Sequence, residues 1–311
     1  MPAEAPSHTP VLVEEVLAAL APRKGGVYVD CTFGRGGHTR ELLTRIGATG
    51  RVLALDRDPQ AVAVGQALAM MDRRLTMRRS PFSALAAITQ AEGVHGRVAG
   101  VLFDLGVSSP QLTDPQRGFG LVADGPLDMR MDPDHGESAA AWLRRASERA
   151  IAEILWTYGE ERFARRVAKA IVRTRAKAAI ETTGQLAAVV ASACPMRRGR
   201  RHPATRTFQA IRIFINGELD ELKAALEAVI DVLAIGGRLV VISFHSLEDR
   251  IVKRFIRQAS YGGPVAPTGH NTVLARPRLR PIGKVVRPSA EEVSRNPRAR
   301  SARLRVAEKC A

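Results

Sequence analysis

The stretch Val27-Tyr28-Val29-Asp30-Cys31-Thr32-Phe33-Gly34-Arg35-Gly36-Gly37-His38-Thr39 joins a short apolar run to an acid and a glycine-rich turn. Glycines at such a turn let the backbone pass close to a ligand and enter a helix sharply. Asp56 lies 20 residues beyond Gly36, where the next apolar run ends. An acid at this place in a doubly wound sheet accepts hydrogen bonds from a ribose. The stretch therefore predicts a nucleotide-like ligand on an α/β fold.

The residues around the turn also discriminate between ligands. A dinucleotide site favours glycine at position 39, where the chain has Thr39, and the Gly-Lys-Ser/Thr of a phosphate-binding loop is absent. Asp30 suits a ligand with an ammonium group and no pyrophosphate, and S-adenosylmethionine fits this description. A NAD-dependent oxidoreductase is disfavoured but remains an alternative. The plainest alternative is a tight turn in which Asp30 and Asp56 only cap helices.

Outward from the turn, apolar runs alternate with helical patterns. The runs at 26–30, 51–56 and 98–104 each end on an acid, and helical spacing lies between them. This alternation predicts a mostly parallel sheet with helices on both faces. The third acid, Asp104, precedes Ser108-Ser109-Pro110-Gln111. Because ligands bind at the carboxyl ends of such strands, we expect these residues to face a second substrate. An ordinary Ser-Pro turn is the alternative.

The pattern changes twice in the second half of the chain. Segments 139–145, 151–158, 163–171 and 186–190 all have helical spacing, which predicts an inserted helical domain over 111–203. One long helix is expected from 205 to 233, bent at Asn216-Gly217 and ended by Gly236-Gly237. A strand at 238–243, a helix at 247–256, a loop at 260–281 and strands at 284–286 and 302–306 follow. The sheet domain is thus expected to be discontinuous, over 1–110 and 204–311.

Charge is concentrated in two short segments. The 311 residues include 47 Lys and Arg against 31 Asp and Glu, a net charge of +16. Fourteen of the excess charges lie in residues 197–212, with six arginines and no acid, and in residues 270–311, with eleven basic and three acidic residues. Local basic patches on a near-neutral body favour a polyanionic partner such as nucleic acid. A solvated charged surface is the alternative.

Composition excludes several classes of protein. With 45% hydrophobic residues the chain can build a core, so a disordered chain is excluded. No run approaches about 18 consecutive apolar residues, and the N-terminus does not resemble a secretory signal, so we expect a cytoplasmic protein without a membrane partner. Cys31, Cys194 and Cys310 are scattered, which predicts neither a disulfide framework nor a zinc site. No cluster has metal-ligand spacing, and we expect no protein-ligated metal.

Taken together, these motifs resemble the bacterial small-subunit ribosomal RNA cytosine-N4-methyltransferases of the MraW/RsmH family. The resemblance spans nearly the whole chain. The matching segments are residues 8–12, 30–39, 55–59, 81–83, 103–111, 125–132, 158–163, 202–210, 243–250 and 296–300. It implies a class I methyltransferase fold, with a mostly parallel seven-stranded sheet and a helical insertion after the fourth strand that recognises the RNA substrate. It also implies S-adenosylmethionine as cofactor and methylation of the N4 amine of a cytidine in the decoding region, near the P site.

The resemblance also assigns residues to roles. Gly36, Gly37 and His38 would contact the methionine end of the cofactor, and Asp56 the ribose. Phe82 would lie against the adenine, and Asp104 and Gln111 would complete the pocket. The partner would be small-subunit RNA or the assembled subunit, and a homodimer is left open.

Chemistry suggests which groups serve the target base. An exocyclic amine is a weak nucleophile and needs alignment with the methyl group at roughly 3–3.5 Å and an oxygen acceptor for its hydrogens. We expect Asp104, Ser108 and Ser109 to surround the amine, with Pro110 and Phe244 packing on the ring. His245, which follows the strand at 238–243, is a further substrate candidate, although a lone histidine is more often structural.

Arginines are the candidates for binding RNA phosphates. We expect Arg197, Arg198, Arg200 and Arg201 to contact the RNA, together with Arg206 and Arg212, which lie off the apolar stripe of their helix. A non-catalytic RNA-binding factor with the same fold is the competing interpretation. Methyl transfer from labelled S-adenosylmethionine distinguishes the two.

Overall fold

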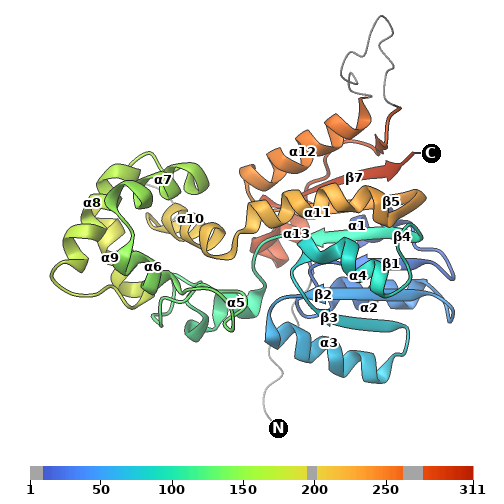
Figure 1. The fold of residues 1–311 in the computed structure, drawn as a ribbon, viewed down its shortest axis with the longest axis horizontal. Helices are drawn as coiled ribbons and strands as arrows, with labels where there is room; N and C mark the ends of the chain where they lie inside the picture. Colours follow the sequence, from blue (N-terminus) through green and yellow to red (C-terminus); the bar gives the residue numbers. More distant parts are fainter. Residues whose placement is uncertain (1–9, 195–201, 262–275, 311) are drawn as a thin grey trace, which may run out of the picture. The chain divides into compact units, whose positions relative to one another are not determined.

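The computed structural model describes residues 10–194, 202–261 and 276–310 (Figure 1). The chain forms two compact units, which are described separately. The sheet unit comprises Met1–Gly106 and Leu219–Ala311, and the helical unit comprises Val107–Glu218. No helix within the described residues is both long and apolar enough to cross a lipid bilayer.

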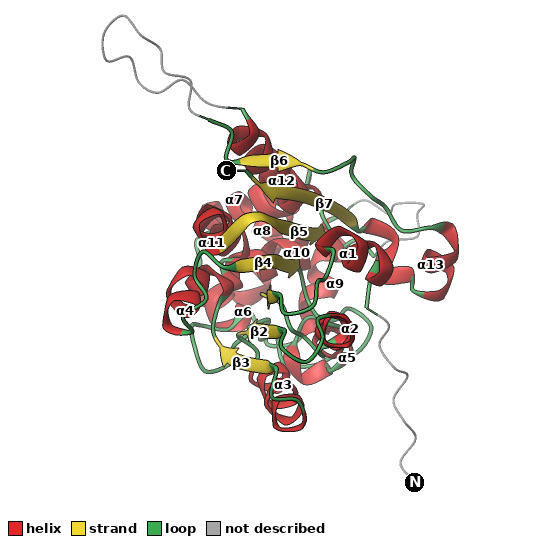
Figure 2. Ribbon diagram, turned by 90° about the vertical axis from the view of Figure 1, so that its right-hand side faces the viewer, coloured by secondary structure: helices red, strands yellow, loops and turns green. Residues whose placement is uncertain are grey.

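The sheet unit contains seven strands in the order β3-β2-β1-β4-β5-β7-β6 (Figure 2). The strands are β1 (Val27–Asp30), β2 (Arg51–Asp56), β3 (Leu75–Arg79), β4 (Val98–Asp104), β5 (Leu233–Ser243), β6 (Leu279–Pro281) and β7 (Arg303–Lys309). Strands β1 to β5 are parallel, and β7 runs antiparallel to both of its neighbours. The predicted α/β class with a mostly parallel seven-stranded sheet is confirmed.

Helices cover both faces of this sheet (Figure 2). They are α1 (Val13–Leu20), α2 (Gly37–Arg45), α3 (Pro59–Met71), α4 (Leu85–Ala91), α11 (Glu218–Val232), α12 (Ser246–Ser260) and α13 (Ala290–Arg295), with short 3-10 turns at Phe82–Ala84 and Pro297–Ser301. One apolar cluster joins α1, α2 and α3 to the sheet, and a second joins α4, α11 and α12 to the other face. Because β1, β2, β4 and β5 are parallel, their carboxyl ends meet at the same edge of the sheet.

Three sequence predictions about the strands are wrong. Strand β3 was not expected, because only Leu75 and Met77 of its five residues are buried and the rest are polar. The segment 284–286 is not a strand. Val286 makes a single bridge to Leu304, and β6 lies instead within the segment expected to be a loop.

The glycines at 236–237 do not end a helix. Helix α11 stops at Val232, and β5 begins at Leu233. Gly236 has φ +75°, and the register between β4 and β5 shifts at this point. The two glycines therefore form an irregularity within β5, a common use of glycine in strands.

The helical unit contains α5 (Ser109–Thr113), α6 (Ala139–Arg145), α7 (Glu148–Gly159), α8 (Ala164–Arg175), α9 (Thr183–Ala193) and α10 (Thr205–Asn216), with a 3-10 turn at Pro115–Arg117. The predicted helices are confirmed. Side chains from α6 to α10 build one apolar core, which includes Trp142, Ile151, Val167, Leu186 and Ile211, and Leu112 of α5 packs against it.

The long helix expected from 205 to 233 is two helices. Gly217 takes a left-handed φ of +59° and ends α10, after which α11 begins. Helix α10 packs on α7, where a Cβ on Gly159 would lie 2.7 Å from the carbonyl oxygen of Arg206. Because of this packing α10 groups with the helical unit, and the division falls after Glu218, whereas the sequence analysis placed it after residue 203.

Candidate cofactor and catalytic site

The glycine turn connects β1 to α2. Gly34 and Gly36 have φ of +56° and +76°, values that favour glycine. The N–H of Gly36 donates to the carbonyl of Phe33 at 2.7 Å, and a Cβ on Gly36 would lie 2.7 Å from the Phe33 ring. The turn therefore packs too closely for larger residues. It brings the amino end of α2 to the carboxyl edge of the sheet.

Asp56 ends β2 beside this turn. Its Oδ2 accepts from the N–H of Gly34 at 2.8 Å, and its Oδ1 accepts from the N–H of Asp58 at 2.9 Å. These bonds fix the carboxyl group and lower its pKa, but burial raises the pKa by more. Burial raises the pKa of Asp56 to about 6. A ligand hydroxyl that donates to this carboxylate would offset part of the cost of burying its charge.

Asp30 ends β1 and is almost fully buried. Its Oδ2 accepts from the Thr39 hydroxyl at 2.7 Å, and its Oδ1 accepts from the N–H of Thr32 at 3.1 Å. Burial raises the pKa of Asp30 above its ordinary value, although these hydrogen bonds and the nearby His38 oppose the shift. Asp30 is thus a buried carboxyl group that would gain from a cationic neighbour.

His38 and Asp104 form the least satisfied polar pair at this edge. His38 Nε2 lies 3.5 Å from Asp104 Oδ2, and the two side chains are 6% and 23% exposed. Within the described residues, neither ring nitrogen of His38 nor Oδ1 of Asp104 has a hydrogen-bond partner. Burial lowers the pKa of His38, but Asp104 and Asp30 outweigh it, and the net shift is upward. Buried polar atoms without partners are expected where a ligand supplies them.

Phe82 lies in the turn before α4. Its ring meets the Phe103 ring edge to face, with centroids 5.7 Å apart, and it packs against the core while remaining half-buried. The open part of the ring can contact a planar ligand group.

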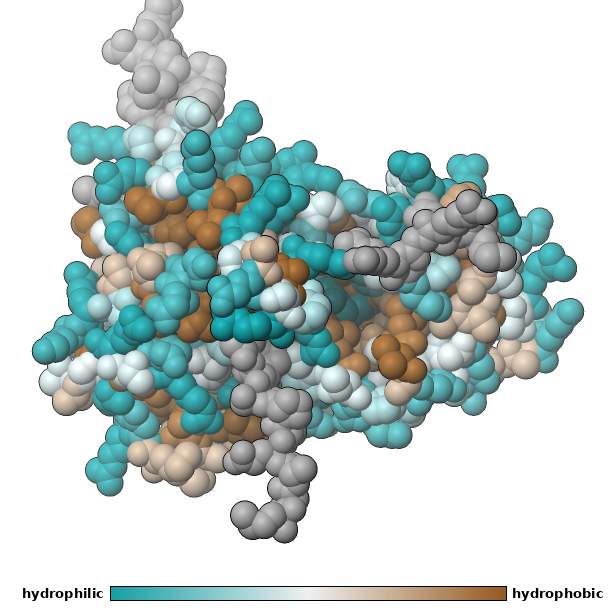
Figure 3. All heavy atoms as spheres, turned by 180° about the vertical axis from the view of Figure 1, so that it is seen from behind, coloured by the Kyte–Doolittle hydropathy of each residue, from teal (hydrophilic) through white to brown (hydrophobic). Residues whose placement is uncertain are grey.

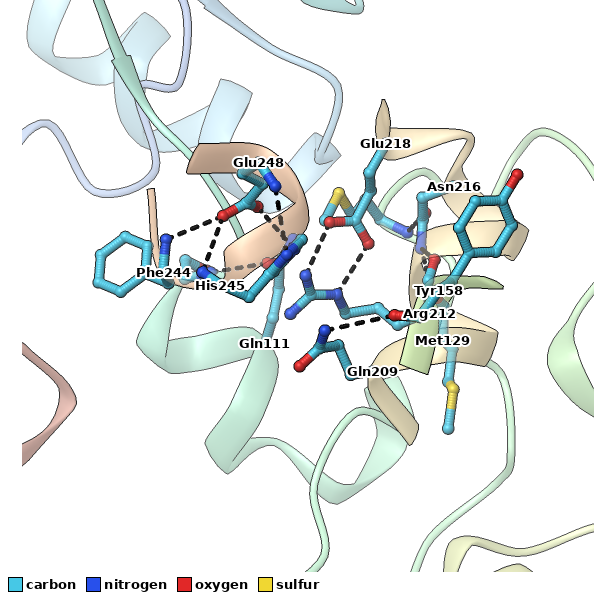
Figure 4. Close-up of polar contacts among 12 residues, drawn as sticks. Gln111, Met129, Tyr158, Gln209, Arg212, Asn216, Glu218, Phe244, His245 and Glu248 are labelled. Carbon is cyan, nitrogen blue, oxygen red and sulfur yellow. Dashed lines mark hydrogen bonds and ion pairs between the residues drawn. The ribbon is translucent and has the colours of Figure 1, made fainter. Parts of the chain in front are cut away.

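Three other candidates of the sheet unit have defined local roles. Asp104 donates its N–H to the Thr32 hydroxyl at 2.7 Å, which ties β4 to the turn after β1. Phe244 packs against the apolar cluster under α1 and α2. His245 is the N-cap of α12 and forms a reciprocal capping box with Glu248 (Figure 4).

The candidates after Gly106 belong to the helical unit. Ser108 is the N-cap of α5, and its N–H donates to Oε1 of the buried Gln111 at 2.9 Å. Ser109 and Pro110 are the first two residues of α5, and both are half-buried. Ser108 and Gln111 are therefore engaged in a helix cap.

Two arginines expected to be free for RNA have partners. Arg212 forms a two-pronged ion pair with Glu218, at 2.7 and 2.8 Å, and both side chains are nearly buried (Figure 4). Arg206 donates to the carbonyl oxygen of Glu160 at 2.9 Å. The prediction that Arg212 is free is wrong, because this pairing uses its guanidinium inside the unit. Arg197, Arg198, Arg200 and Arg201 lie outside the described residues.

Comparison with known proteins decides the family. The family model described as MraW methylase matches residues 5–310. The chain belongs to the MraW methylase family.

Individual relatives of this methylase cover it almost completely. Proteins named ribosomal RNA small subunit methyltransferase H share 56% identity over 308 residues in Thiobacillus denitrificans and 53% over 308 residues in Nitrosococcus oceani. Each match covers 98% of this chain and 98% of the relative. The predicted family and S-adenosylmethionine dependence are confirmed.

The edge of the sheet unit fits S-adenosylmethionine. The ligand carries an ammonium and a sulfonium, and the edge presents the Asp30, Asp56 and Asp104 carboxyl groups together with the orphaned polar atoms of His38 and Asp104. The glycine turn leaves room for close backbone approach. When bound, the cofactor supplies an electrophilic methyl group.

Two residues of the methylase that position these groups were not anticipated. Thr32 holds the backbone of Asp104, and Thr39 holds the buried Asp30 carboxyl. Both lie inside the glycine-turn stretch. The sequence does not show which group a threonine hydroxyl binds until the residues beside it in the fold are known.

Proposed function

We propose that this protein methylates the N4 amine of a cytidine in the decoding region of small-subunit ribosomal RNA, near the P site. The observation that carries the proposal is the family membership, together with relatives of 53–56% identity whose names specify small-subunit ribosomal RNA. The choice of amine and position rests on the resemblance of the motifs and on the chemistry of the edge.

The proposed cofactor contacts follow the edge of the sheet. The backbone at Gly36 and Gly37 and the side chain of His38 contact the methionine end of the cofactor. Asp56 accepts hydrogen bonds from the ribose, and Phe82 lies against the adenine. Gln111, in the helical unit, is the further cofactor contact that the family resemblance implies. The supporting features are the glycine turn, the fixed Asp56 carboxyl and the half-buried Phe82 ring.

The amine of cytosine needs an oxygen acceptor before it attacks. Its lone pair is delocalised into the ring, so methylation builds positive charge on the nitrogen until a proton leaves. The free Oδ1 of Asp104 can accept a hydrogen bond from the amine and stabilise this charge. His38, on the other oxygen, orients the carboxylate. We assign Asp104 as the acceptor that holds the amine.

The two serines are not equivalent in this scheme. Ser108 caps α5, so its substitution also weakens that helix. Ser109 does not cap the helix, and we assign its hydroxyl to a hydrogen bond with the amine or the neighbouring carbonyl of the base. Pro110, and Phe244 where it reaches the base, would pack on the ring.

Single-turnover methylation of unmethylated small subunits tests the assignment. Asp104→Asn removes the charge, and the rate of the chemical step should fall about 100- to 1000-fold. Ser109→Ala should reduce the rate less, about tenfold, because it removes one neutral hydrogen bond.

Two exposed positions supply matched controls. Asp231→Asn and Ser192→Ala make the same chemical changes at exposed sites and should leave the rate unchanged. Rates close to wild type for both Asp104→Asn and Ser109→Ala would show that neither group holds the amine.

A further inference from the structure

One face of α8 carries a row of basic side chains without acidic neighbours. The chain from Arg162 to Lys177 holds seven basic residues and no acid, whereas ten of the eleven acids of residues 111–196 precede it. Six of the seven are exposed, four on α8 and one in the turn on each side of it, and together they are called here the α8 basic face. They are Arg162, Arg165, Arg166, Lys169, Arg173 and Lys177.

The opposite side of α8 explains how this face is held. Val167, Ala168 and Ile171 are fully buried in the core of the helical unit. Arg175, the seventh basic residue, turns inward and donates to the carbonyl of Leu143. The apolar side therefore anchors the helix and fixes the direction of the basic face. Figure 3 shows hydrophilic side chains projecting along the outer margin of the helical unit, where α8 lies.

The α8 basic face lacks the ion pairs found elsewhere in the chain. No ion pair links any of its six residues to a carboxylate of residues 10–194, 202–261 or 276–310, and Arg166 only stacks on the Phe163 ring, at 5.8 Å. By contrast Arg74, Arg130 and Arg212 each bind an aspartate or glutamate.

This arrangement destabilises the helix by itself. Within α8, residues 165 and 169 and residues 169 and 173 are like-charge pairs four apart, which repel each other on a helix surface. An ordinary solvated helix mixes signs, as α7 does with Glu148, Arg149 and Glu153. The repulsion is relieved when a polyanion binds.

We propose that the α8 basic face binds phosphates of the small-subunit RNA and so docks the substrate on the helical unit. The proposal rests on the proposed function for the identity of the polyanion. From Arg165 to Arg173 the face extends about 12 Å along the helix, enough to meet more than one phosphate. An anionic membrane is disfavoured, because the apolar side of α8 is buried and cannot enter a bilayer.

The test compares two fourfold variants of the full-length protein. The first is R165Q/R166Q/K169Q/R173Q. The second is R23Q/K24Q/R51Q/R73Q, which removes three arginines and one lysine that are also exposed. They lie at the edge of the sheet unit where the parallel strands begin, away from the strand ends that carry the candidate cofactor site. Glutamine supports helices about as well as the residues it replaces in α8, and the control positions are exposed residues outside helices, so both variants should fold. Circular dichroism and thermal melting verify this.

The first readout is binding to unmethylated small subunits and to their protein-free RNA, measured over a range of salt. Loss of four phosphate contacts should make the slope of log K against log salt shallower by about 3, and the control should keep the wild-type slope. R165K/R166K/R173K, which keeps the charge, should retain most of the slope. Equal slopes for both fourfold variants, or an α8 effect on anionic vesicles but not on RNA, would overturn the proposal.

The second readout separates this inference from the proposed function. In methyl transfer, the α8 variant should raise KM for the subunit and leave kcat and the KM for S-adenosylmethionine unchanged. The labelled nucleoside made by the wild-type protein is identified in parallel. A product other than N4-methylcytidine contradicts the proposed function, while the salt slopes still decide the role of α8. A lowered kcat with an unchanged subunit KM would contradict docking.

Discussion

At the scale of single residues, the three acids at strand ends have different environments. Asp30 is sealed in the protein and held by Thr39, Asp56 is fixed by two backbone N–H groups, and Asp104 keeps one free oxygen. Sequence position could predict that all three lie at one edge, because parallel strands end together. It could not predict the division of roles, which depends on partners such as Thr32 in the turn after β1.

The raised pKa of Asp56 has a consequence for cofactor binding. Ribose hydroxyls donate best to the ionised carboxylate, so affinity for S-adenosylhomocysteine should be constant above about pH 7 and weaken about tenfold per pH unit below the pKa of about 6. Asp56→Asn should bind about 10- to 100-fold more weakly at pH 8 and lose this step in its profile. Titration calorimetry from pH 5 to 8 measures both effects.

His38 and Asp30 also have raised pKa values, so their titration has to be distinguished from that of Asp56. His38→Gln is therefore the comparison, since it should keep the step that Asp56→Asn removes. An unchanged step in Asp56→Asn would assign the pH dependence to another group.

The same shift has the opposite sign for stability. The folded state favours the protonated Asp56 relative to the unfolded chain, so its contribution is full below the ordinary aspartate pKa and is lost as pH rises through about 6. Without ligand, the melting temperature of wild type minus that of Asp56→Asn should therefore decrease between pH 5 and 7. An increase over that interval would contradict the burial of this carboxyl.

At the scale of elements, periodicity predicted helices better than it predicted edge strands and boundaries. The helices of the insertion have continuous apolar stripes, and each was found. Strand β3 and strand β6 lie toward the edges of the sheet and bury few residues, so they lack a clear pattern. The apolar spacing from 205 to 233 continues through Gly217 without a break. The apolar residues of α10 pack into the core of the helical unit and those of α11 into the core of the sheet unit, and the two sets have the same helical spacing in the sequence.

The contact of α7 with α10 depends on Gly159. Gly159→Ala would place a methyl group 2.7 Å from the backbone carbonyl of Arg206, which cannot rotate away. We expect a loss of about 1–3 kcal/mol in the free energy of unfolding, measured by denaturant titration.

Gly65→Ala in α3 is the comparison. Its methyl group would meet the thioether of Met77, a flexible side chain, so the loss should be smaller. A larger loss at Gly65 than at Gly159 would contradict the rigid packing of α7 on α10.

At the scale of the whole molecule, the net charge indicates a polyanionic partner. Summing the charge over long regions of the chain conceals one basic segment. Residues 111–196 balance to +1, yet ten of their eleven acids precede Arg162, and seven of their twelve basic residues lie between Arg162 and Lys177. The segments 197–212 and 270–311 remain predicted RNA contacts, and neutralising Arg197, Arg198, Arg200 and Arg201 should reduce the salt dependence of RNA binding without changing affinity for S-adenosylmethionine. An unchanged salt slope would remove that segment from the RNA site.

The central claim is the reaction itself. The most direct measurement incubates the protein with methyl-labelled S-adenosylmethionine and unmethylated small subunits, then digests the RNA and separates the nucleosides. We predict label in N4-methylcytidine, recovered from a fragment of the decoding region. Label in another nucleoside, or none although the protein binds the cofactor, would contradict it.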